Sequence, residues 1–182
     1  MTDRLLVLLR ERSFAKKRVV LASGKESDFF VDCKQTVLLA EGHALVGEAM
    51  YEKTRAFGVA PRAVAGVALG GCPLASAVAL VSHQKGTPLD ALYVRKATKD
   101  HGSQRRIEGD THLDRGARIV VLEDVVTTGG STIEAVEHLR EAGYAVVGVV
   151  ALVDRGEGGA EALAAAEVPF VALYGREDFL GE

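Results

Sequence analysis

The chain contains few cysteines, few prolines and no tryptophan: two cysteines and four prolines occur among its 182 residues. Cys33 and Cys72 lie far apart and match no CxxC or Cys/His ligand spacing. That separation argues against a disulfide scaffold and against a zinc site. We expect both to be small packed side chains of a protein from the reducing cytoplasm.

Long apolar runs and an excess of positive charge are also missing. No run approaches the length of a membrane-spanning helix. The start, with only Leu5 to Leu9 as an uninterrupted apolar run and no small-residue cleavage site, is unlike a signal peptide. The formal net charge is −3 and the sequence pI is near 6.0, unlike the basic footprint of nucleic-acid binders. We expect no membrane or nucleic-acid partner, and a local cluster must hold any anionic ligand.

The residues that are present predict one α/β domain over residues 1–182. Apolar residues make up 48% of the chain, enough for a substantial core. The N-terminal part reads as a helix at 3–12, a hairpin within 18–33 and a helix at 36–57 that stops at Gly58. Strand patterns follow at 63–68, 90–95, 118–123, 145–153 and 169–173, and helical ones from Pro73, at 131–142, capped by Gly143, and at 158–166. This alternation predicts a mainly parallel sheet with helices on both faces.

The stretch VVLEDVVTTGGST, residues 120–132, carries the strongest chemical signal. Its strand brings Glu123 and Asp124 to the carboxyl edge of the sheet, where ligands of open α/β sheets bind. The loop 127–131 then supplies hydroxyls and approachable backbone N–H groups at a helix start, a site suited to phosphate. The pattern has neither P-loop nor GxGxxG spacing. A strand end followed by a well-capped helix remains the alternative interpretation.

This stretch resembles the phosphoribosyl-diphosphate (PRPP) motif of the type I phosphoribosyltransferases: four apolar residues, two acids, two apolar residues and a Thr- and Gly-containing loop. The resemblance implies that the acids hold the ribose hydroxyls and that residues 127–131 cradle the 5′-phosphate. The implied PRPP-binding residues here are Glu123, Asp124, Val125, Val126, Thr127, Thr128, Gly129, Gly130 and Ser131. Glu123 departs from the pattern, because Asp is commoner at that position.

Other segments resemble the orotate phosphoribosyltransferase family. LASGKESDFFVDCK, residues 21–34, is similar to its SG-(K/R)-x-S-x-(Y/F)-(Y/F)-x-D segment, which implies an orotate pocket lined by Phe29 and Phe30. The alternative is a hairpin with two core phenylalanines. Some family members carry a lysine where this chain has Ala22, so any orotate or pyrophosphate contact of that lysine is absent here or is supplied by Lys25, which we expect to bind orotate.

Three more segments complete the resemblance. AGVALGGCPLASAVAL, residues 65–80, looks like the pyrophosphate loop, which implies a PRPP contact at Gly70 and Gly71. YVRKATKDHGSQRRIEG, residues 93–109, resembles the mobile catalytic loop; a solvated charged loop is its alternative, and Arg105 and Arg106 are read as surface residues. The resemblance implies that the basic residues of this loop bind PRPP, and these residues are Arg95, Lys96, Lys99 and His101. VALVDRGEGG, residues 150–159, is similar to the family's strand that ends in Asp-Arg, which implies that Arg155 contacts the orotate carboxylate. The resemblance also implies that Thr127, in the loop after strand 118–123, binds orotate.

Taken as a whole, the resemblance implies a type I phosphoribosyltransferase fold with a small hood at about 1–35 and a core at about 36–182. It implies transfer of the phosphoribosyl group from PRPP to orotate, with Lys99, His101 and Asp124 catalytic, in a homodimer with shared active sites. Mg²⁺ would be bound through PRPP; no direct protein ligand is expected, and a water-mediated contact to Asp124 is left open. The alternatives are a phosphoribosyltransferase for another nucleobase and a PRPP-sensing regulatory module.

Overall fold

A computed structural model describes residues 3–20, 26–95 and 106–180 of the chain. Its main sheet has six strands in the order β5-β4-β3-β6-β7-β8. The strands are β3 (Ala63–Val67), β4 (Asp90–Val94), β5 (Ile107–Glu108), β6 (Arg118–Val126), β7 (Ala145–Asp154) and β8 (Phe170–Gly175). All neighbours pair in parallel except β4 and β5. The predicted mainly parallel sheet is therefore confirmed.

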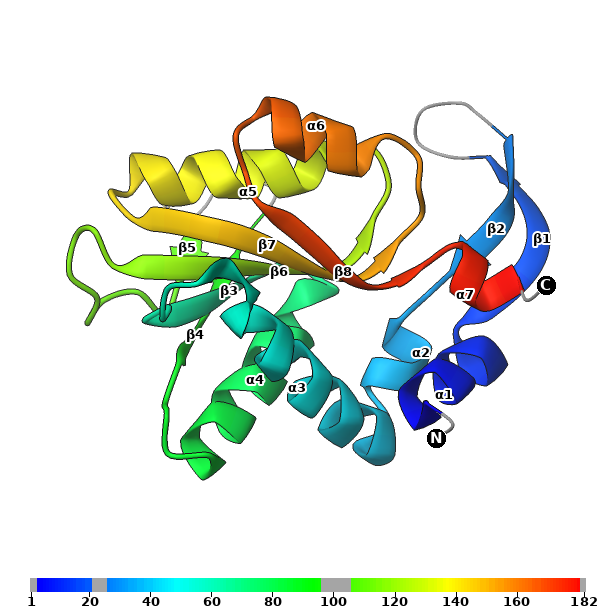
Figure 1. Cartoon of the computed structure of the whole chain (residues 1–182), viewed down its shortest axis with the longest axis horizontal. Helices are drawn as coiled ribbons and strands as arrows, with labels where there is room; N and C mark the ends of the chain where they lie inside the picture. Colours follow the sequence, from blue (N-terminus) through cyan, green and yellow to red (C-terminus); the bar gives the residue numbers. More distant parts are fainter. Residues whose placement is uncertain (1–2, 21–25, 96–105, 181–182) are drawn as a thin grey trace, which may run out of the picture.

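Helices cover both faces of this sheet (Figure 1). The helices α3 (Ala40–Thr54) and α4 (Gly71–Gln84) lie on one face, and α5 (Gly130–Glu141) and α6 (Gly159–Ala165) lie on the other. The sheet consequently separates two buried apolar clusters: Val120 and Leu122 of β6 belong to one, and Ile119 and Val121 to the other. This alternation along β6 is what a strand buried on both faces requires.

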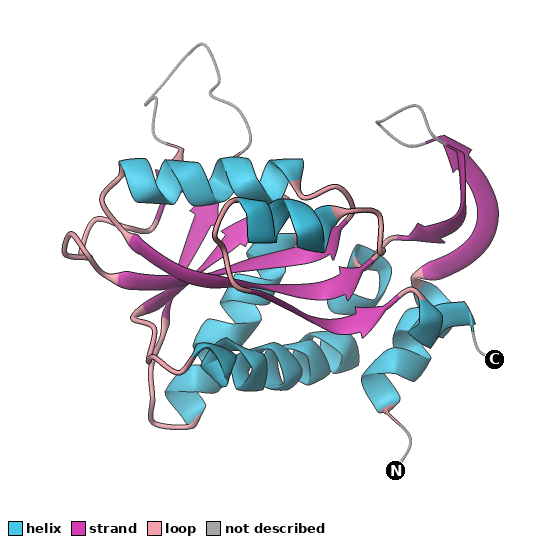
Figure 2. Cartoon of the chain, turned by 45° about the horizontal axis from the view of Figure 1, so that its top comes forward, coloured by secondary structure: helices cyan, strands magenta, loops and turns pink. Residues whose placement is uncertain are grey.

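The N-terminal segment forms a separate two-stranded sheet. Helix α1 (Arg4–Arg12) is capped by Asp3, whose carboxylate accepts the Leu6 N–H, and it leads into β1 (Phe14–Val20) and β2 (Glu26–Val31). These strands pair antiparallel, as the predicted hairpin requires, and curve away from the main sheet (Figure 2). A hood boundary near residue 35 stays a prediction.

The C-terminal segment contacts the N-terminal segment. Helix α7 (Glu177–Leu180) follows β8, and both termini lie on the same side of the molecule (Figure 1). The Tyr174 hydroxyl donates to an Asp3 carboxylate oxygen at 2.9 Å, and the Arg10 Nε donates to the Asp178 carbonyl at 2.6 Å. Within the described ranges no helix combines the length and apolar character needed to cross a bilayer.

Several predicted boundaries were wrong. The helix expected at 36–57 is divided into α2 (Lys34–Val37), α3 and a 3₁₀ turn, η1 (Arg55–Phe57). Helix α4 begins at Gly71, two residues before the expected Pro73. Strand β6 continues to Val126 instead of ending at residue 123, because Val125 and Val126 still pair with β7. Strand β5 and helix α7 were not predicted; two- and four-residue elements carry almost no periodic signal.

Candidate functional site

The two adjacent acids point to opposite faces of the sheet because they lie inside β6. Glu123 is only 3% exposed, and its carboxylate accepts a hydrogen bond at 3.1 Å from the hydroxyl of Thr132 in α5. Asp124 is half-buried and lies on the face of α4. Strand alternation therefore reduces the repulsion expected between neighbouring carboxylates.

Asp124 faces the turn between β3 and α4. A Cβ atom added to Gly70 would lie 2.0 Å from Asp124 Oδ2, and one added to Gly71 would lie 2.4 Å from the Leu122 carbonyl oxygen. Because the Leu122 carbonyl belongs to the backbone of β6, glycine is required at position 71 for the turn to approach the strand this closely. The peptide bond between Ala68 and Leu69 in this turn is cis. The structure thus brings together two sequence segments, 68–72 and 123–124, that were predicted to share one ligand.

The loop after β6 leads directly into helix α5. Gly129 takes the left-handed conformation, with φ at 80°, and its carbonyl accepts the first helical N–H, that of Ile133, at 2.9 Å. A Cβ at Gly159, the first residue of α6, would lie 2.7 Å from the Thr127 carbonyl oxygen. Thr128 and Gly130 are exposed, while Thr127 and Ser131 are half-buried. One side of the loop therefore packs closely against α6, and the side that carries Thr128 and Gly130 is exposed, at the N-terminus of the twelve-residue helix α5.

Arg155 follows β7 at the same edge and joins the main sheet to the hairpin. Its backbone N–H donates to the Val126 carbonyl at 3.0 Å, next to the phosphate-type loop. Its guanidinium Nη2 donates to the Phe29 carbonyl at 2.8 Å and lies 2.8 Å from Glu157 Oε1. The side chain is buried, at 8% exposure. A guanidinium held from two sides in this way is pre-oriented for a carboxylate.

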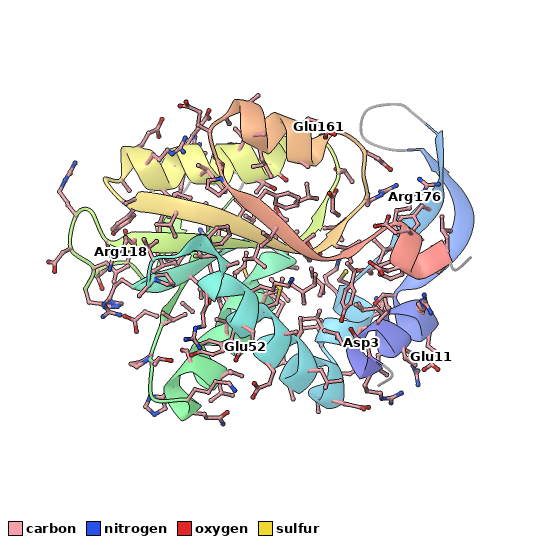
Figure 3. All side chains as sticks on the ribbon, viewed as in Figure 1. Asp3, Glu11, Glu52, Arg118, Glu161 and Arg176 are labelled. Carbon is pink, nitrogen blue, oxygen red and sulfur yellow. The ribbon has the colours of Figure 1, made fainter. Side chains whose placement is uncertain are left out.

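The phenylalanine pair is divided between core and surface. The Phe29 ring is fully enclosed, with ring centroids 5.1 Å from Phe14 and 5.5 Å from Phe179. The guanidinium groups of Arg155 and Arg176 lie over it at 5.7 and 5.5 Å; Figure 3 labels Arg176 between β8 and the hairpin. This enclosure favours the core alternative for the Phe29 ring. Phe30 is half-buried and stays a predicted pocket residue.

The basic segment is described only at its two ends. The Arg95 N–H donates to the Arg106 carbonyl at 2.8 Å, which continues the β4–β5 ladder. The Arg95 Nε lies 3.4 Å from Glu108 Oε1, and Arg106 Nη1 lies 3.7 Å from Glu134 Oε1 in α5. The other residues predicted there, Lys96, Lys99 and His101, and Lys25 and Ala22 of the hairpin, lie outside the described residues.

Sequence reasoning assigned no contact at the site to Glu157 or Cys33, and it named Thr132 only among the hydroxyls that follow the two acids. Thr132 holds Glu123, Glu157 pairs with Arg155, and Cys33 donates its thiol to the Asp124 carbonyl at 3.8 Å. Burial, together with the charge of Asp124, raises the pKa of the Cys33 thiol well above its ordinary value, so this thiol stays protonated. The sequence signal for Thr132 was its place among the hydroxyl side chains that follow the two acids at a helix start.

Comparisons with known proteins agree with this arrangement. The family model for the phosphoribosyl transferase domain matches residues 36–168, so fold and site define a type I phosphoribosyltransferase. A Sorangium cellulosum orotate phosphoribosyltransferase is 66% identical over 98% of this chain and 92% of its own length. The chain belongs to the orotate phosphoribosyltransferase family.

Solved structures extend the likeness to three dimensions. A crystal structure of Mycobacterium tuberculosis H37Rv orotate phosphoribosyltransferase in complex with Fe(III) dicitrate superposes with a TM-score of 0.82 at 38% identity and covers 98% of both chains. A structure of the Mycobacterium tuberculosis protein in complex with PRPP has a TM-score of 0.78 at 35% identity and covers 97% of both chains. The hairpin and the C-terminal elements, which lie outside the family match, are therefore included in the structural likeness.

Proposed function

We propose that this protein transfers the phosphoribosyl group from PRPP to orotate, giving orotidine 5′-monophosphate and pyrophosphate. The observation that carries the proposal is the meeting of three elements at one sheet edge: Asp124 against the Gly70 turn, the open loop at the start of α5, and the buried guanidinium of Arg155. Family membership supports the same reaction and its place in pyrimidine nucleotide synthesis.

The PRPP half of the site follows from charge and hydrogen-bonding capacity. Residues 127–131 offer hydroxyls and backbone N–H groups to the 5′-phosphate at the N-terminus of α5. Asp124, with Glu123 behind it, accepts hydrogen bonds from the ribose hydroxyls. Gly70 and Gly71 let pyrophosphate approach the backbone. The PRPP complex of the Mycobacterium tuberculosis relative supports PRPP as the ligand.

The orotate half rests on Arg155. Orotate carries a carboxylate, and a buried guanidinium is the group best suited to bind it bidentately. The orotate carboxylate would form an ion pair with the Arg155 guanidinium, which also pairs with Glu157. Phe30 and Thr127 border the path between this guanidinium and the ribose site in our proposal.

The chemistry is displacement at the anomeric carbon through a cation-like sugar. The protein must therefore stabilise the departing pyrophosphate and exclude water, which would hydrolyse the same cation. We assign these tasks to Arg95, Lys96, Lys99 and His101, with Lys99 or His101 as the proton donor to the leaving group.

Magnesium fits the donor set. Mg²⁺ keeps several waters and binds through one or two carboxylates and substrate phosphates, and Asp124 presents one half-buried carboxylate beside the pyrophosphate turn. In the part of the chain that the structure describes, no group of three or more His, Cys, Asp or Glu residues forms a metal cage. When bound with PRPP, the ion supplies positive charge to the phosphates.

We further propose a homodimer. Leu38, Leu69 and Tyr93 are exposed large hydrophobic residues that line one hollow beside the pyrophosphate turn. Exposed apolar patches of this kind mark interaction surfaces. A second copy packed against these side chains would border the hollow and lie next to the site, in agreement with shared active sites. We place the protein in the cytoplasm, since Cys33 and Cys72 are free thiols suited to a reducing compartment.

The test is an assay with Mg²⁺ and PRPP in which orotate, uracil, adenine, hypoxanthine, guanine and xanthine are supplied in separate reactions. Base consumption and pyrophosphate release are followed together. We expect turnover of orotate alone. Turnover of another base would keep the PRPP site and overturn the orotate pocket, and PRPP binding without any turnover would favour the sensing module.

A further inference from the structure

The proposed pyrophosphate site places a negative side chain beside a negative ligand. Asp124 lies against the Gly70 turn, whereas the Glu123 carboxylate points to the α5 face of the sheet. Pyrophosphate bound there needs positive charge close by, because the Asp124 carboxylate and the phosphate groups are both negative and repel each other. Lys34 lies beside this turn, because it lines the same hollow as Leu69 and Cys72.

Lys34 is the first residue of α2, and its position is fixed on two sides. The preceding residue, Cys33, donates its thiol to the Asp124 carbonyl, so this part of the chain lies against β6. The ammonium of Lys34 lies 2.6 Å from Asp32 Oδ1, and the other Asp32 oxygen accepts from Gln35 Nε2 at 3.1 Å. Asp32 therefore holds the lysine at the junction between hairpin and sheet.

Lys34 also shares a hollow with the pyrophosphate turn. This hollow has a volume of about 360 Å³, and its lining includes Lys34 together with Leu69 and Cys72, which flank Gly70 and Gly71. The Lys34 side chain is 40% exposed, so an incoming anion reaches it without unfolding the hairpin. The hydrogen bond to Asp32 raises the pKa of Lys34 and the charge of Asp124 adds to this, so the group is cationic at neutral pH.

We propose that Lys34 binds the pyrophosphate group of PRPP, with Asp32 as its positioning residue; the inference rests on the proposed function. A lysine ammonium is a compact point charge that suits phosphate oxygens. It supplies positive charge from just beyond the C-terminal end of β2, the second strand of the hairpin.

The experiment compares Lys34→Gln, Lys34→Arg and the control Lys85→Gln. Lys85 pairs with Glu48 at 2.9 Å at the far end of α4, away from the site. For each protein we would measure the KM for PRPP, the KM for orotate and, by calorimetry without orotate, the dissociation constant of pyrophosphate with Mg²⁺. Calorimetry measures pyrophosphate binding without turnover. If the wild-type protein binds pyrophosphate but does not turn over orotate, only the proposed base is refuted, and the test of Lys34 remains valid.

Lys34→Gln is expected to weaken pyrophosphate binding and to raise the PRPP KM by about tenfold each, as loss of one charge-assisted hydrogen bond does. The orotate KM should stay within about twofold, and Lys34→Arg should restore most pyrophosphate affinity. Pyrophosphate affinity equal to that of wild type in Lys34→Gln overturns the proposal. An orotate KM that rises as much as the PRPP KM also overturns it, because Lys34 would then act only on structure.

Discussion

Replacing Arg155 with alanine should mainly weaken orotate binding. The Arg155 side chain is 8% exposed, and its guanidinium makes two interactions at 2.8 Å, one with the Phe29 carbonyl and one with Glu157. Removing one partner of a buried charged pair costs about 2–5 kcal/mol. We take about 3 kcal/mol for the orotate carboxylate, which corresponds to a rise in the orotate dissociation constant of about 150-fold.

The same substitution should also loosen the hairpin, because the bond to the Phe29 carbonyl is lost. A hydrogen bond from a charged group contributes about 1.5–3 kcal/mol to the free energy of unfolding, and this corresponds to a fall in Tm of about 3–10 °C for a chain of this size. Arg155→Lys keeps the charge but loses the planar fork, so we expect a smaller fall in Tm with most of the orotate defect retained.

The assay is orotate saturation at fixed PRPP, with thermal melting of the same samples. Glu157→Gln separates the two effects, because it retains the guanidinium and removes the carboxylate that shares its charge. We expect Glu157→Gln to bind orotate more tightly than wild type. An Arg155→Ala protein whose orotate KM stays within about twofold of wild type would refute the assignment of Arg155 to the base pocket.

Three further predictions concern other parts of the site. Lys99→Ala should lower kcat far more than it raises the orotate KM, and an unchanged kcat in steady-state kinetics would remove Lys99 from the chemistry. Thr132→Val removes the hydroxyl that donates to the buried Glu123 and should lower the free energy of unfolding by about 2 kcal/mol in urea titrations. Thr132→Ser should lose less than half of that, and equal stability of both variants would contradict the role of this bond. Burial raises the pKa of Asp32, but hydrogen bonds from Lys34 and Gln35 outweigh it and hold that pKa below its ordinary value of 3.8. Asp32 therefore stabilises the fold above pH 3.8, so the deficit of Asp32→Asn should be present at pH 7 and vanish as the pH falls below 3.8; a deficit that persists at pH 2 would show another cause.

The local pattern of the sequence determined the order of the principal helices and strands. Continuous apolar runs such as AVVGVVALV predicted buried parallel strands, and the glycines at 58 and 143 ended helices where the structure ends them. The same pattern placed the acids, the Thr- and Gly-containing loop and Arg155 at strand ends, hence at one edge of the sheet. Periodicity and turn chemistry act over a few residues, so a linear sequence carries them in full.

Contacts between distant segments were decided only by the tertiary structure. The end of β6 depended on pairing of Val125 and Val126 with β7, and that pairing separated the directions of Glu123 and Asp124. The enclosure of Phe29 depended on Phe179, which is 150 residues later in the chain. The approach of Gly70 to Asp124 and the place of Lys34 likewise depended on packing between elements. Such contacts form between residues far apart in sequence, so no local pattern encodes them, and they exist only once the elements are packed.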